Sequence, residues 1–117
     1  MDPLTFGSVE VSVLGDGGRV LMAGEIDAAL APDLEAVLAG LGTARRVEVD
    51  VRQVTFLDST GLAFLVRALR GGECTVVVVG PCPPVSHLLE LTGIAAHVEQ
   101  VEEPLDLRSG GAGAPHG

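Results

Sequence analysis

The segment with the clearest potential for chemistry is Asp58-Ser59-Thr60-Gly61. It follows an apolar run that ends at Leu57 and precedes apolar residues at helical spacing, so it marks the start of a helix. A serine at such a junction has two interpretations. Its hydroxyl can cap the helix, or it can accept a phosphate, which suits the free amides and partial positive charge of a helix start.

Several neighbours of this segment are candidates for contact with a partner. Thr60 offers a second hydroxyl and is the less favoured acceptor. Gly61 has no side chain, so a partner's backbone would be able to approach the helix closely. The predicted apolar stripe of this helix consists of Leu62, Leu65, Val66 and Leu69. Phe64 and Arg67 lie off it, so Phe64 either packs against a partner beside Arg67 or is partly buried under a neighbouring loop. Asp27 is either a helix cap or part of the same surface.

The residues needed for catalysis are missing from the sequence pattern. A hydrolase or another small enzyme built on Asp58 and Ser59 would need a general base. His87, His97 and His116 are scattered, and none is paired with a nucleophile by the sequence. We therefore expect no catalytic residue and no enzymatic activity.

The two cysteines, Cys74 and Cys82, have neither CxxC spacing nor a nearby pair of histidines. We expect reduced thiols, one of them a small core residue, and no metal site or cofactor.

Composition narrows the partners. The chain has 117 residues, 47% of them hydrophobic, which suffices for one domain with one core. A formal net charge of −9 disfavours nucleic acid and anionic membranes. Aromatic residues make up 3% of the chain, which leaves little for base stacking. Without a signal peptide or a long apolar run, a cytoplasmic protein that binds other proteins is expected.

The hydrophobic pattern predicts alternating strands and helices. Strands are expected at residues 8–14, 19–23, 47–51, 74–79 and 97–101, helices at 28–41, 61–69 and 85–91, and a terminal helical turn at 104–107. Val47 to Val51 alternates valine with Glu48 and Asp50, which predicts one buried face and one acidic face in water.

The fold class that follows is α/β. An N-terminal β-hairpin precedes βα units, which favour a mostly parallel sheet with helices mainly on one face. The domain is expected to span residues 1–108, and residues 109–117 are expected to form a flexible tail.

Three segments together resemble one family. Residues 55–62, with Asp58-Ser59-Thr60-Gly61, resemble the phosphorylation motif of bacterial anti-sigma factor antagonists, which are STAS domains. Gly24-Glu25-Ile26-Asp27 is similar to that family's motif before its first helix, and Leu91-Thr92-Gly93-Ile94 to the turn after its third. The resemblance covers residues 8 to 103 and implies a STAS-like domain.

The resemblance also implies a function. Ser59 would be the phosphoacceptor, and the unphosphorylated protein would bind an anti-sigma factor that is also a serine kinase, thereby releasing a sigma factor. Phosphorylation would end that binding, and a phosphatase would reverse it. The free protein is expected to be a monomer. STAS domains also serve in other assemblies, so a subunit that docks on a transporter ATPase or joins a stress-signalling complex without being phosphorylated is the alternative.

Overall fold

The computed structural model describes residues 7–104, which form a five-stranded sheet and three α-helices. The strands are β1 (Ser8–Leu14), β2 (Gly17–Ile26), β3 (Arg46–Leu57), β4 (Thr75–Val79) and β5 (Glu99–Val101). The helices are α1 (Ala31–Leu41), α2 (Ser59–Leu69) and α3 (Pro83–Leu91), joined by 3-10 turns η2 (Ala28–Leu30), η3 (Arg70–Gly72) and η4 (Ile94–Ala96). The helical turn expected at residues 104–107 lies almost entirely outside this range, and the tail expected at 109–117 lies wholly outside it.

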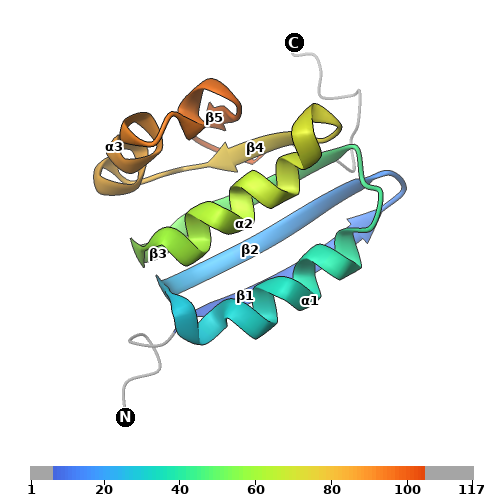
Figure 1. The fold of residues 1–117 in the computed structure, drawn as a ribbon, viewed down its shortest axis with the longest axis horizontal. Coiled ribbons are helices and arrows are strands. Elements are labelled where there is room, and N and C mark those ends of the chain that lie inside the picture. The colour runs from blue at the N-terminus through green and yellow to red at the C-terminus, as the bar shows by residue number, and fades with distance from the viewer. Residues whose placement is uncertain (1–6, 105–117) are drawn as a thin grey trace.

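The sheet has the topology that the sequence predicts. Its strand order is β1-β2-β3-β4-β5, with β1 antiparallel to β2 and the other neighbours parallel. A hairpin is therefore followed by βα units, as expected. Figure 1 shows α1 and α2 lying side by side over the same face of the sheet and running in the same direction.

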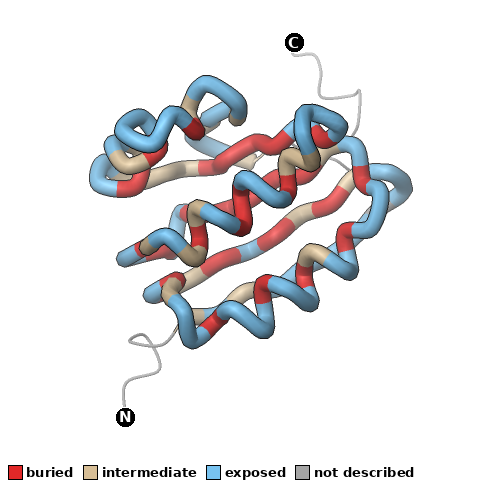
Figure 2. The backbone as a smooth tube through the Cα atoms, in the orientation of Figure 1, coloured by how far each residue is buried: buried red, intermediate tan, exposed pale blue. Residues whose placement is uncertain are grey.

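The core lies between this face and the helices (Figure 2). Alternate residues of β2 and β3, such as Val20 and Val49, meet Leu34 and Val37 of α1 and Leu65 of α2 in one buried cluster. Cys74 also joins this cluster, in agreement with the predicted core thiol, and both cysteines are free. Within residues 7–104 no helix is both long and apolar enough to cross a membrane.

The buried stripe of α2 differs from the predicted one. It consists of Gly61, Phe64, Leu65 and Ala68, whereas Val66 is 52% exposed. The spacing of three, four and seven residues is the helical period, but two of its members are small. A stripe chosen for its large aliphatic side chains therefore missed the glycine and the alanine that let the helix lie close to the sheet.

The expectation of an acidic face in water on β3 is wrong. Glu48 and Asp50 are only 1% and 4% exposed. They are in register with Val77 and Val79 of β4, which are also fully buried, so this part of the strand is covered on both faces. Alternation of valine with an acid showed that the two faces differ chemically, but it did not show that the acidic one is solvated.

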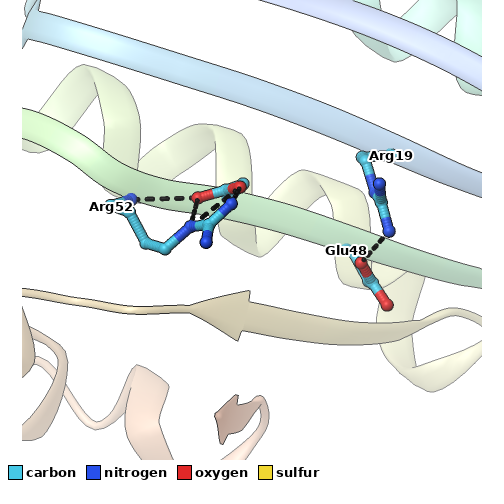
Figure 3. Close-up of polar contacts among 4 residues, drawn as sticks. Arg19, Glu48 and Arg52 are labelled. Atoms are coloured by element: carbon cyan, nitrogen blue, oxygen red, sulfur yellow. Dashed lines mark hydrogen bonds and ion pairs between the residues drawn. The ribbon is translucent and has the colours of Figure 1, made fainter. Parts of the chain in front are cut away.

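Arginine pairing allows these two carboxylates to be buried (Figure 3). Arg19 of β2, in register with Glu48, donates from its Nη2 to the Glu48 Oε1 at 3.0 Å. Arg52 binds Asp50 with both Nε and Nη2, the latter at 2.7 Å. Burial opposes ionisation of Asp50, but the hydrogen bonds and charge of Arg52, aided by Arg19, outweigh it and lower the pKa of the carboxyl group. Each of the two buried acids has an arginine partner, and for Asp50 this pairing favours the charged form.

Candidate functional site at the carboxyl ends of β2 and β3

Asp58 begins helix α2 and acts as its cap. Its backbone is extended, and its carboxylate Oδ1 accepts a hydrogen bond from the Thr60 amide at 2.7 Å. Its carbonyl oxygen accepts the amide of Leu62 at 3.1 Å, the first bond of the helix. The side chain that caps this helix is therefore that of Asp58, and not that of Ser59, for which the sequence had allowed this role.

Ser59 is the first residue of α2 and is exposed. Among the described residues no hydrogen bond occupies its hydroxyl, since the neighbouring aspartate already caps the helix. The hydroxyl is thus exposed at the start of a capped helix. Thr60, one position later, is half-buried, so it is the less accessible of the two hydroxyl residues.

Asp27 lies on the adjacent loop and has the same role as Asp58. Its carboxylate Oδ1 accepts the amide of Ala29 at 3.0 Å and so caps the turn η2 that leads into α1. The amide of Asp58 donates to the carbonyl of Ile26 at 3.1 Å, which ties the ends of β2 and β3 together. The sheet thereby brings two capping carboxylates and Ser59 to the same end of the domain.

Two of the predicted partner contacts are corrected by the structure. Phe64 is only 2% exposed and belongs to the core, so the alternative of burial holds, and it is burial against the sheet. Gly61 is also buried. A Cβ added there would lie 2.7 Å from Cγ of Leu57, so its missing side chain makes room for the underlying strand and leaves none for a partner.

Arg67 is on the surface, as expected, but it is paired within the chain. Its guanidinium forms an ion pair with Glu35 of α1, and Nη2 lies 3.2 Å from Oε1. Both side chains are more than half exposed. The hydrogen bond from Arg67 lowers the pKa of Glu35, and the same bond raises the pKa of Arg67. Sequence reasoning missed Glu35, because a partner 32 positions away has no local signal.

A groove of about 330 Å³ runs between α1 and α2. Ser59 and Thr60 line one part of it, and Arg67 and Glu35 line another. A second hollow, of about 630 Å³, is lined by the last turn of α2, β4 and the segment before β5, and contains none of the predicted site residues. The smaller groove is therefore the one that belongs to the site.

Other chemistry receives no support from the described geometry. Within residues 7–104 no three His, Cys, Asp or Glu side chains gather as metal ligands. Cys74 is buried, which raises the pKa of its thiol against the opposing influence of Arg70. His87 and His97 are exposed and do not line the groove beside Ser59, and His116 lies outside the described residues.

These features define a class of protein: a single mixed α/β domain that presents an exposed serine at a capped helix start, flanked by acids. The family model described as "Mlab, STAS domain" matches residues 9–102. The chain belongs to the STAS domain family, as the sequence motifs indicated.

Curated relatives agree with this assignment. An anti-sigma-B factor antagonist of Staphylococcus aureus strain NCTC 8325 is 33% identical over an alignment of 82 residues, and the match covers 65% of this chain and 75% of the relative. One from Staphylococcus epidermidis is 30% identical over an alignment of 93 residues, and the match covers 74% of this chain and 85% of the relative.

Solved structures share the fold. An anti-sigma factor antagonist from Mycobacterium paratuberculosis is similar with a TM-score of 0.73 at 24% identity, covering 96% of this chain and 97% of the other. The unphosphorylated form of the anti-sigma factor antagonist SpoIIAA is similar with a TM-score of 0.65 at 15% identity, covering 90% and 95%.

Proposed function

We propose that this chain is an anti-sigma factor antagonist controlled by phosphorylation of Ser59. Unphosphorylated, it binds an anti-sigma factor that is also a serine kinase, and the sigma factor held by that kinase is released. Phosphorylated, it no longer binds, until a phosphatase restores the free hydroxyl. The observation that carries this proposal is the exposed Ser59 hydroxyl on a helix start that Asp58 already caps.

Electrostatics explains why one phosphate is enough. It adds about −1.5 to −2 charges at neutral pH, beside the Asp58 carboxylate and on the same sheet end as Asp27. The whole chain has a formal net charge of −9. A partner surface that fits the unmodified serine would have to desolvate this added charge, or would meet it with acids of its own. Binding is lost without any change of fold.

In this proposal the chain is a substrate and not a catalyst. The kinase supplies ATP and the catalytic base, and the antagonist supplies the acceptor and the surface on which the kinase docks. The protein works as a monomer in the bacterial cytoplasm, with residues 1–108 as its STAS-like domain. Neither a metal nor a cofactor of its own takes part.

Mass spectrometry tests the acceptor directly. The protein is incubated with ATP and the candidate anti-sigma kinase of the same organism, and the phosphate is located on peptides. We expect label on Ser59, no label in Ser59→Ala, and unchanged labelling in the control Thr60→Ala. Absence of label on wild-type protein, or equal label in Ser59→Ala, would refute Ser59 as the acceptor.

A binding titration tests the switch. Ser59→Ala adds no charge at position 59 and is expected to bind the kinase as tightly as wild type. Ser59→Asp adds one negative charge at this position and is expected to bind more weakly. Equal affinities of the two variants would contradict the charge mechanism. Binding to a transporter ATPase without any phosphorylation would instead establish the assembly-subunit function.

A further inference from the structure

The groove between α1 and α2 has an apolar floor and unusually low walls. Leu34 and Phe64 are buried at its base, and Leu38 is half-buried. The walls are formed by Ala31 of α1 and Ala63 of α2, both exposed. Because an alanine ends at Cβ, the two helices leave space between them where larger side chains would have met.

Polar groups define the two ends of this groove. Ser59 and Thr60 lie at the end where both helices start. The Glu35–Arg67 ion pair crosses from α1 to α2 further along. Ser59 and Arg67 are eight positions apart on one helix, which corresponds to about 12 Å of helix length. The volume of about 330 Å³ is enough for one or two side chains of a partner.

The charges beside the groove indicate which kind of partner residue would lie next to the inserted side chain. Asp27 caps the turn that leads into α1, and Asp58 caps α2, so both carboxylates stand at the serine end. Among residues 7–104, Arg67 is the single cation that lines the groove, and it is paired with Glu35. An apolar side chain next to a lysine or arginine matches this arrangement, since the apolar part fills the floor and the cation faces the two caps.

Resting on the proposed function, we propose that this groove is the docking pocket for the anti-sigma kinase, which inserts an apolar side chain flanked by a basic residue. The groove is continuous with the acceptor, because Ser59 is part of its lining. A phosphate on Ser59 would occupy the entrance of the groove and so prevent the apolar side chain of the partner from reaching its floor.

Filling the groove from either wall tests this proposal. Ala63→Leu and Ala31→Leu extend side chains into the space from opposite helices. The matched controls are Ala36→Leu and Ala39→Leu, which make the same substitution at exposed positions of α1 outside the groove. All four positions are exposed, so thermal unfolding is expected to show each variant folded.

The readout is titration of the purified kinase with each unphosphorylated protein in the presence of ADP. We expect Ala63→Leu and Ala31→Leu to weaken binding on the order of tenfold, about 1.4 kcal/mol, and the controls to bind like wild type. Affinity is expected to fall as salt is raised, because the caps and the basic residue attract each other.

The possible failures are distinguishable. If wild type binds and both groove variants bind equally well, the docking pocket is refuted while the proposed function stands. If the controls weaken binding as much as the groove variants, the groove is likewise refuted as the specific site. If wild-type protein itself does not bind the kinase, the proposed function fails and the pocket fails with it.

Discussion

Replacing Gly61 with alanine is expected to destabilise the domain, although alanine is the better helix former. An added Cβ would lie 2.7 Å and 2.9 Å from Cγ and Cδ1 of Leu57, and 3.2 Å from Cγ2 of Ile26. Carbon atoms in good contact are about 3.5–4.0 Å apart. Leu57 is 6% exposed and Ile26 is fully buried, so neither has free space into which to move. The helix must shift away from the sheet, or both side chains must repack.

The size of the effect is a balance of two terms. Overpacking a core by one methyl group costs about 1–3 kcal/mol. Replacing glycine with alanine inside a helix stabilises the protein by up to about 1 kcal/mol, because alanine has the higher helix propensity, and by less in the first turn. The net expectation is a loss of about 1–2 kcal/mol, with a shift of Tm by about 4–8 °C for each kcal/mol in a domain of this size. Urea and thermal unfolding followed by circular dichroism measure it.

Gly40 provides a matched control. It is exposed near the end of α1, and an added Cβ would find only Val11 Cγ1 at 3.8 Å, an ordinary contact. Gly40→Ala is therefore expected to leave stability unchanged or to raise it by up to about 1 kcal/mol. If Gly61→Ala is as stable as wild type, or is stabilised like Gly40→Ala, then Gly61 is not required for close packing and the assignment of its face to the core is wrong.

Two further predictions concern buried or capping carboxylates. Asp58→Ala is expected to cost about 0.5–2 kcal/mol because the Thr60 amide loses its cap, whereas Asp58→Asn, which keeps the cap without the charge, is expected to cost far less; equal losses in urea unfolding would show that charge and not capping matters. Arg52→Met removes the side-chain partner of Asp50 and is expected to lower the free energy of unfolding at neutral pH, because the buried carboxylate loses its guanidinium partner. Pairing lowers the pKa of Asp50 below its ordinary 3.8, so the extra stability of wild type over Arg52→Met is fully present above pH 3.8. This extra stability shrinks as the pH falls through the lowered pKa of the folded state. A difference that persists unchanged in urea titrations at pH 2 would contradict this.

The order of elements was predictable because it depends on local patterns. Alternating valines, helical leucine spacing and glycine-rich turns each indicate one element, and short βα connections then constrain the sheet. The beginnings and ends were less well predicted. β3 extends from Arg46 to Leu57, well beyond the predicted 47–51, because its second half lacks regular alternation and is instead fixed by pairing with β2 across two register shifts.

Which face of each element is buried was harder to predict, since that depends on residues distant in sequence. The burial of Glu48 relies on Arg19, which lies on another strand and comes into register only when the sheet forms. The position of Phe64 relies on Gly61 and Ala68 allowing α2 to approach the sheet. Small residues contribute little to a hydrophobic pattern. The pattern therefore assigned the wrong face of α2 to the core.

The candidate site shows the same division. The strand, the aspartate and the helix start around Ser59 are contiguous in sequence, so their arrangement was predictable. The groove was not predictable, because it depends on Ala31 and Ala63, which lie on two different helices. The sequence does not show that these two small side chains face each other. The Glu35–Arg67 pair that borders the groove is likewise visible only in three dimensions.

Capping by Asp58 bears on how strongly a phosphate at Ser59 is felt by a partner. The helix start normally compensates an anion with its free amides. Here the Thr60 amide already donates to the Asp58 carboxylate, so one of the amides at the helix start is not available to a phosphate. Arg67, the cation that lines the groove, is held by Glu35. A phosphate would therefore be compensated less by this helix start than by an uncapped one, and the charge that remains is what a docking partner would meet.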